Sequence, residues 1–230
     1  MIPVHSPKPT RNHVFPETEK QGVYNAIYKR RDVRSQFLPD AIPDELLHKL
    51  LDAAHHAGSV GFMQPWSFIV VQSGEIKRKV KHLFEQANER AAAVFEGERR
   101  ALYSRLKLEG ILESPVNICV TCDPARHGPH VIGRHTIRET DIYSTCCSIQ
   151  NLWLAARAEG IGLGWVSILD PAELRMILQI PEHVVPVAYL CLGYVTEFLP
   201  QPELESAGWL QRVPVKDIIF YEQWGKKEGQ

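Results

Sequence analysis

Three arginines stand within five residues near the N-terminus, in the sequence Arg30-Arg31-Asp32-Val33-Arg34. The planar guanidinium group presents its N–H donors as a fixed fork, which matches the oxygens of a phosphate. The segment is therefore a candidate phosphate site, although runs of charge are more often solvated surface turns. Asp32 is unusual in either setting, because a carboxylate among arginines should stay ionised and could serve as an anchor, an acceptor or a base.

A second candidate is the segment 58–66, which reads Gly-Ser-Val-Gly-Phe-Met-Gln-Pro-Trp. Its two glycines allow the backbone to approach a flat ligand closely. Ser59 and Gln64 offer hydrogen bonds, while Met63 and Trp66 offer apolar contact. An ordinary connection between a helix and a strand, with a buried tryptophan, explains the same residues equally well.

A third candidate is the segment 160–167, which reads Gly-Ile-Gly-Leu-Gly-Trp-Val-Ser. Its glycine spacing is similar to a dinucleotide fingerprint, but such a loop leaves a strand and opens a helix. Here the glycines leave an expected helix and enter an expected strand, so we reject a nicotinamide-binding Rossmann site. What remains is a strand whose main chain can lie against a ring, with Ser167 as its polar group.

The cysteines and histidines do not indicate a metal site. Cys119 and Cys122 spell C-x-x-C, but they lie in an apolar run that reads as a strand, where this spacing directs the side chains to opposite faces. His127 and His130 stand in a loop without a clear set of partner ligands. We predict no metal, and we interpret the five cysteines as reduced thiols rather than as a disulfide framework.

The elements that must position these residues follow from hydrophobic periodicity. It predicts helices from residue 43 to a stop at Gly58, over 75–95 and 140–159, and one opened by residues 170–173. It predicts strands over 68–71, 116–122, 164–168 and 186–192. The helix at 140–159 is apolar around most of its circumference, so we expect it to be central.

Strands separated by helices predict a mixed domain with helices packed on a sheet, and we expect a single domain over residues 1–230. We expect an extended N-terminal arm at 1–20, a surface flap at 97–114 and a loop at 126–138. The C-terminal extension, 200–230, has too little apolar surface to form a second domain. We therefore expect it to wrap around a second subunit.

Composition excludes several function classes. The net charge of the 230 residues is −1, so no basic excess indicates a nucleic-acid partner. No stretch approaches the ~20 apolar residues of a membrane helix. The first ten residues are polar and rich in proline, unlike a secretory signal. We expect a cytoplasmic protein.

Taken together, segments 30–34, 59–66 and 162–167 resemble the nitroreductase-like flavoproteins. That family has an arginine-rich segment near its N-terminus, a small-residue loop running into Gln-Pro-Trp, and a glycine-rich turn into a strand after its central helix. The resemblance covers roughly residues 30–212. It implies FMN as the ligand, an α+β fold with a central, mostly antiparallel sheet flanked by helices, and a homodimer with its sites at the interface.

Within the family, the sequence is most similar to the members that fragment reduced FMN with molecular oxygen. Their products are 5,6-dimethylbenzimidazole, the lower ligand of vitamin B12, and erythrose 4-phosphate. The similarity rests on Asp32, where ordinary nitroreductases usually have serine, and on the other two segments. Gly58 departs from the proline expected before Ser59. A separate NAD(P)H-dependent flavin reductase would have to supply the reduced FMN.

The resemblance also implies roles for individual residues. Arginines hold the phosphate, the loop at 59–64 supports the ring, and Asp32 and Ser167 act in the chemistry. The flap would exclude water and nicotinamide from the reacting flavin. The implied FMN-binding residues are Arg30, Arg31, Asp32, Val33, Arg34, Ser59, Val60, Gly61, Met63, Gln64, Val166, Ser167, Ile168 and Arg212.

Two other functions fit the same FMN site. One is a conventional NAD(P)H-dependent nitro or quinone reductase, and the other is a non-catalytic flavin carrier. Asp32 favours flavin fragmentation over both, because neither a hydride shuttle nor a phosphate anchor has an evident use for this carboxylate.

Overall fold

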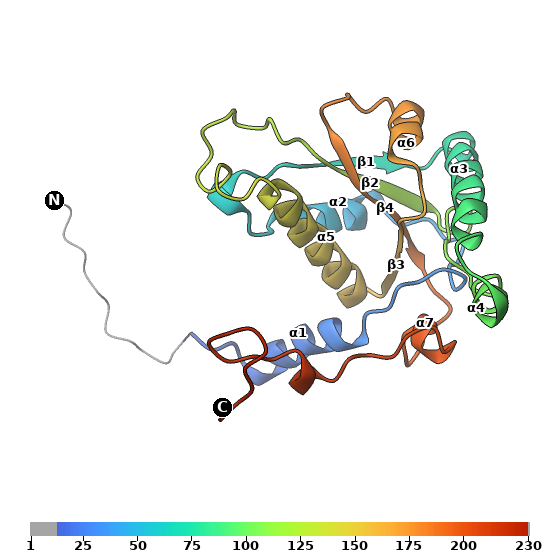
Figure 1. Cartoon of the computed structure of the whole chain (residues 1–230). Coiled ribbons are helices and arrows are strands. Elements are labelled where there is room, and N and C mark those ends of the chain that lie inside the picture. Colours follow the sequence, from blue (N-terminus) through green and yellow to red (C-terminus); the bar gives the residue numbers. More distant parts are fainter. Residues whose placement is uncertain (1–12, 230) are drawn as a thin grey trace.

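The computed structural model describes residues 13–229 and contains one four-stranded antiparallel sheet (Figure 1). The strands are β1 (Trp66–Val71), β2 (Val116–Cys122), β3 (Ile161–Val166) and β4 (Val185–Tyr194), in the order β1-β2-β4-β3. Each pairs antiparallel with its neighbour. The predicted α+β class is confirmed.

Helices surround this sheet, and the predicted helices are confirmed with shifts of a few residues at their ends. The α-helices are α1 (Glu17–Lys29), α2 (Asp44–His55), α3 (Gly74–Ala92), α4 (Gly97–Tyr103), α5 (Thr140–Ala158), α6 (Pro171–Leu178) and α7 (Glu203–Ser206). Two short 3-10 helices are η1 (Val60–Phe62) and η2 (Val215–Asp217). Residues 126–138 form the expected loop.

The two faces of the sheet carry separate cores. On β2, Ile118 and Val120 pack with residues of α2 and α5, whereas Cys119 packs with residues of α3 and α6. Cys122 contacts Thr145 of α5, on the face away from Cys119, so the two cysteines point to opposite faces as predicted. Helix α5 contributes three apolar side chains with no exposed surface, Ile149, Leu152 and Ala156, which agrees with the predicted central position.

Strand β3 differs from its predicted bounds, since it begins at Ile161 and ends at Val166 instead of covering 164–168. Gly162, which the sequence placed before the strand, and Gly164 both lie inside β3. The arginine-rich segment passes close to both of them there. The N–H of Val33 donates to the carbonyl of Leu163 at 3.0 Å, and a side chain at Gly164 would collide with the Val33 carbonyl. Because these glycines have no side chains, the backbone of the arginine-rich segment can pack directly against β3.

Helix α1 was not predicted. It includes residues 17–20, so the expected extended arm at 1–20 is wrong for these four residues. Residues 1–12 of that arm lie outside the described residues. Pro16 precedes the helix, and Glu17 and Glu19 lie at its positive end. Ala26 is its one buried residue, so the helix has no clear apolar face toward its own chain. That weak periodicity explains why the sequence pattern missed it.

The expected surface flap at 97–114 is wrong for its second half. Helix α4 is largely exposed, but Glu109 and Ile111 are 2% and 0% exposed. Lys107 and Lys81 donate to Glu109 at 2.6 and 2.9 Å, which ties the segment to α3. Burial alone would raise the pKa of Glu109, but these contacts and the Ile111 N–H hold it below its usual value.

Candidate functional site

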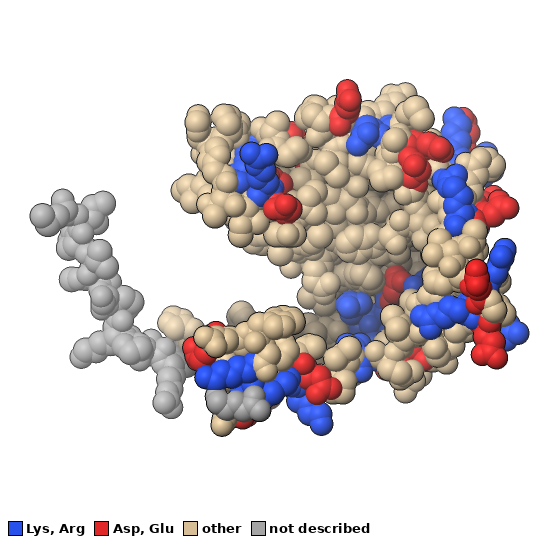
Figure 2. All heavy atoms as spheres, viewed as in Figure 1, with Lys and Arg blue, Asp and Glu red and all other residues tan. Residues whose placement is uncertain are grey.

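The arginine-rich segment lines a pocket of about 660 Å³. The segment follows α1 and joins the free edge of β3 through a bridge between Asp32 and Leu163. Figure 2 shows a hollow in the surface of the molecule, with basic and acidic side chains together at its inner end. The pocket is lined by Ile27, Tyr28, Arg30, Arg31, Asp32, Arg34, Pro202, Glu203, Leu204 and Arg212.

The predicted phosphate arginines therefore meet in space, and Arg212 joins them from the C-terminal extension. Arg30 stacks its guanidinium on the ring of Trp153, with 4.6 Å to the centroid. Arg31 donates to the carbonyls of Tyr28, at 2.9 Å, and Pro200, so it fastens the extension to the end of α1. Burial, and then the nearby arginines, lower the pKa of Arg31.

Arg34 is buried, and it is paired with two carboxylates. Its Nη2 donates to Oδ2 of Asp32 at 2.6 Å, and its Nη1 lies 3.7 Å from Oε2 of Glu203. Sequence reasoning found Arg34 and Asp32 but missed Glu203, because nothing in the sequence connects residue 203 with residue 34. Four arginines against two carboxylates leave the pocket with an excess of positive charge.

Asp32 has a second contact that the sequence did not reveal. Its Oδ1 accepts a hydrogen bond from the backbone N–H of Trp165 at 2.8 Å. This bond holds the arginine-rich segment against β3. Burial raises the pKa of Asp32, although Arg34 and the Trp165 N–H act in the opposite direction.

The pocket fits a phosphate group. Within residues 13–229, Nε of Arg31 and Nε of Arg34 are buried without a hydrogen-bond partner. Both belong to arginines that line the pocket, and leaving such donors unpaired is costly. A phosphate has enough acceptor oxygens to bond them, so the donor set suits the phosphate of FMN.

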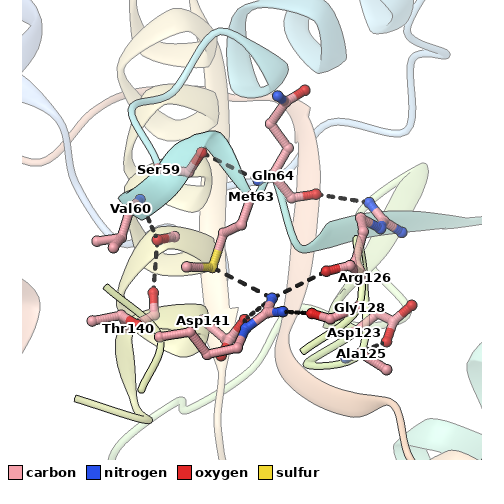
Figure 3. A network of polar contacts seen from close by, with 12 residues as sticks. Ser59, Val60, Met63, Gln64, Asp123, Ala125, Arg126, Gly128, Thr140 and Asp141 are labelled. Carbon is pink, nitrogen blue, oxygen red and sulfur yellow. Dashed lines mark hydrogen bonds and ion pairs between the residues drawn. The ribbon is translucent and has the colours of Figure 1, made fainter. Parts of the chain in front are cut away.

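The loop at residues 59–64 is a separate structure. Ser59 Oγ accepts from the N–H of Gln64 at 3.2 Å, and the N–H of Val60 donates to Ser144 Oγ at 3.1 Å (Figure 3). Gly61 has a φ of 56°, and a side chain there would collide with the Ile132 carbonyl. Glycine is therefore required at position 61 by the packing of two loops.

Two arginines that sequence reasoning missed, Arg126 (Figure 3) and Arg134, hold this loop in place. Arg126 donates to the carbonyls of Gln64 and Trp66 at 2.8 and 2.6 Å. Arg134 is buried, forms an ion pair with Asp141 at 2.7 Å, and donates to the Arg126 carbonyl at 3.2 Å. Both arginines lie in the loop 126–138, and no motif there indicated this role.

The structure does not bring every predicted residue to the arginine pocket. Ser59 to Gln64, Val166, Ser167 and Ile168 do not line it, and Met63 is completely buried. Val33 is also buried, against Gly162. Ser167 lies just after β3, exposed, at a smaller pocket of about 130 Å³. A site that joins all three segments stays a prediction.

No group of three or more His, Cys, Asp or Glu side chains within residues 13–229 is placed to hold a metal ion. None of the helices described is long and apolar enough to cross a membrane.

Comparison with known proteins gives a consistent result. Residues 27–194 match the family described as the Nitroreductase family. The chain is 42% identical to the 5,6-dimethylbenzimidazole synthase of Rhodospirillum rubrum over 201 residues, covering 87% of this chain and 95% of that protein. It is 38% identical to the 5,6-dimethylbenzimidazole synthase of Rhodobacter capsulatus, covering 88% and 97%. The resemblance drawn from segments 30–34, 59–66 and 162–167 is confirmed.

A solved structure supports the fold. The structure of a nitroreductase with bound FMN from Desulfitobacterium hafniense has a TM-score of 0.62 at 23% identity, covering 88% of this chain and 98% of that chain.

Proposed function

The chain belongs to the nitroreductase family, and from that premise we propose that it converts reduced FMN and molecular oxygen into 5,6-dimethylbenzimidazole and erythrose 4-phosphate, with the remaining pyrimidine ring of the flavin released as a third fragment. The observation that carries the proposal is the pocket that gathers Arg30, Arg31, Arg34 and Arg212 around Asp32. The names of the relatives at 42% and 38% identity point to the same product. In this proposal FMN is a substrate that is consumed.

Reduced FMN, when bound, would supply both the reactivity toward oxygen and the atoms of the products. The chain's part is to hold and orient it. Arg30, Arg34 and Arg212 would bind the phosphate together with the buried Nε of Arg31, whose Nη2 holds the extension at Pro200 in place. A phosphate fixed in this way directs the ribityl chain past Asp32, the acidic residue in the same segment.

Asp32 would take up hydrogen from the ribityl chain, as a base or as a positioning acceptor. Its two oxygens are already oriented, one by Trp165 and the other by Arg34. Because burial raises its pKa, its carboxylate binds a proton more strongly than an exposed aspartate does. Both properties suit a base that must act at one fixed carbon.

The rest of the site is proposed to form when two chains associate. Helix α1 and the extension expose large apolar side chains, including Tyr24, Ile27, Ile218 and Trp224, as a subunit interface would require. In a homodimer the loop at 59–64 and Ser167 would meet the flavin ring. A stable monomer in light scattering, with flavin still bound, would contradict this arrangement.

The proposal also implies a supplier of substrate. Reduced FMN must come from a separate NAD(P)H-dependent flavin reductase, and we place both activities in the cytoplasm.

The direct test is to incubate the protein with chemically reduced FMN in air and to search for 5,6-dimethylbenzimidazole by mass spectrometry. We expect the product to form from FMN and to be nearly absent with reduced riboflavin, which lacks the phosphate. Flavin that is bound while neither flavin nor oxygen is consumed would identify a carrier instead.

One observation keeps a second candidate open. The hydrogen bond from Trp165 gives Asp32 a structural use, so its presence does not by itself require flavin fragmentation. A conventional nitro or quinone reductase could use the same pocket. Steady oxidation of NADPH with a nitroaromatic compound, with FMN recovered intact, would select this alternative.

A further inference from the structure

Glu203 is an unexpected component of the arginine pocket. It lies on α7, in the C-terminal extension, and lines the pocket together with the arginines. Its Oε2 is 3.7 Å from Nη1 of Arg34, and the two side chains are 26% and 10% exposed. A carboxylate at this distance repels a phosphate that approaches Arg34.

The contact between Glu203 and Arg34 is an ion pair without a hydrogen bond. Oε2 of Glu203 is buried and has no hydrogen-bond partner within residues 13–229. Nε of Arg34 is also buried and also lacks a hydrogen-bond partner in this part of the chain. An ion pair with unpaired polar atoms on both sides is weak, since neither group recovers the hydrogen bonds that it made with water. A phosphate, with more acceptor oxygens and more charge, would replace it readily.

The extension does not depend on this pair for its position. Arg31 donates to the carbonyl of Pro200 before α7, and the ring of Trp209 after α7 lies 3.9 Å from the guanidinium of Arg99 on α4. Within the extension, the N–H of Arg212 donates to Glu205 at 3.2 Å. The Glu203 side chain can therefore leave Arg34 while the backbone of α7 stays over the pocket.

We propose that Glu203 is a built-in competitor of the flavin phosphate for Arg34, and that it limits how tightly phosphate-bearing molecules are held. The inference rests on the proposed binding of FMN phosphate in this pocket. It also gives the carboxylate a use in the proposed reaction, whose small product carries the same phosphate. A competing carboxylate weakens the hold on that product, so the pocket empties after each turnover.

A different role of Glu203 would change the binding of FMN and of riboflavin in a different way. If Glu203 instead accepted hydrogen bonds from ribityl hydroxyls, it would stabilise FMN and riboflavin alike, because both carry the ribityl chain. Competition for Arg34 affects only the flavin with a phosphate. The ratio of the two affinities therefore separates the roles, and a purely structural role of Glu203 would not change that ratio.

The experiment is a fluorescence titration of oxidised FMN and of riboflavin with the full-length protein and with Glu203→Gln, which keeps the shape and removes the charge. We expect Glu203→Gln to bind FMN ~3-fold to 10-fold more tightly, from the loss of one partly exposed charge contact. Its affinity for riboflavin should stay within ~2-fold of the unmodified protein. Equal changes for both flavins, or weaker binding of FMN, would overturn the proposal.

The matched control is Glu197→Gln, which removes the same charge from an exposed residue that does not line the pocket. It should leave both affinities unchanged, and an equal tightening of FMN by this variant would also overturn the proposal. Glu203→Asp, which keeps the charge, should lie closer to the unmodified protein than Glu203→Gln does. Thermal melts of all variants identify any loss of folding.

The outcome is distinguishable from a failure of the proposed function. If FMN binds and tightens selectively in Glu203→Gln but no 5,6-dimethylbenzimidazole forms, the competitor role stands and the proposed reaction fails. If the product forms but Glu203→Gln shows no selective tightening, the reaction stands and the competitor role fails. If the protein binds no FMN, both fail.

Discussion

In the arginine pocket, buried nitrogens of Arg31 and Arg34 have no hydrogen-bond partner in the described chain, whereas the loop at residues 59–64 is bonded within the chain on several sides. The two regions are the proposed halves of one flavin site. The unpaired donors of the pocket can form new hydrogen bonds with a ligand, whereas the hydrogen-bonding groups of the loop named above are already paired. This difference predicts that changes in the pocket affect binding and chemistry, and that changes behind the loop affect stability first.

The largest effect should come from Asp32→Asn, which keeps the shape and removes the charge. The amide oxygen can still accept from the Trp165 N–H, so we expect the variant to fold and to bind reduced FMN. Formation of 5,6-dimethylbenzimidazole should fall by about a hundredfold to ten-thousandfold, the usual contribution of a general base. Stopped-flow absorbance in air, with the product assayed in parallel, separates binding from chemistry.

Ser167→Gly serves as the comparison for Asp32→Asn. It should also lose product, but less completely, because water can replace a hydroxyl contact in part. A normal yield from Asp32→Asn would contradict the catalytic role and favour the reductase alternative, since Trp165 already explains the carboxylate.

Behind the loop, Arg134→Met should mainly reduce stability. Arg134 and Asp141 form a buried ion pair, and removing one partner leaves the other charge buried alone. Loss of a buried partner typically costs about 3–5 kcal/mol of the free energy of unfolding, which urea denaturation measures. Arg138→Met is the control, because Arg138 is an exposed arginine of the same loop. A change below ~1 kcal/mol would show that the loop is held by other contacts.

In the pocket, Arg34→Ala should weaken FMN binding by about tenfold to a hundredfold, which corresponds to a charge-assisted contact of roughly 1.5–3 kcal/mol. Riboflavin binding should change little, because riboflavin has no phosphate. Arg105→Ala, at an exposed arginine outside the pocket, should change neither affinity. If FMN and riboflavin weaken equally in Arg34→Ala, or bind equally well to the unmodified protein, the phosphate assignment is wrong.

The sequence predicted these two regions to different degrees. The pocket was anticipated in part, because the guanidinium groups at positions 30, 31 and 34 made this segment a candidate phosphate site, although a solvated charged turn was the more frequent explanation of such a run. Glu203 was missed because its meeting with Arg34 depends on the path of the whole C-terminal extension. The hydrogen bond between Asp32 and Trp165 was missed for the same reason, since it joins residues 133 positions apart.

The boundaries of the elements show the same limit. Helix α6 was predicted from local chemistry: Asp170 accepts from the N–H groups of Ala172 and Glu173, as its capping position indicates. Strand β3 was misplaced, because glycines have weak strand preference and only the crossing of Val33 explains them. Helix α1 was missed since its apolar residues mostly face away from its own chain.

The smallest effect expected is on the pH dependence of stability in the ligand-free protein, and it follows from the charge of Asp32. Burial raises the pKa of Asp32 in the folded chain above its value in the unfolded chain, so the folded chain binds this proton more tightly. The contribution of Asp32 to stability is therefore greatest below the unfolded pKa. It decreases as the pH rises toward the folded pKa, and it is constant above that.

Thermal melts of the unmodified protein and of Asp32→Asn, recorded from pH 4 to pH 8, test this sign. The melting temperature of the unmodified protein relative to Asp32→Asn should fall as the pH rises through the lower part of this range. Asp40→Asn, at an exposed aspartate, should show no such trend. A rise instead of a fall would mean that Arg34 and the Trp165 N–H outweigh burial at Asp32. The pocket would then be a stabilised ion-pair site like that of Arg134 and Asp141, and the contrast between the two regions would not hold.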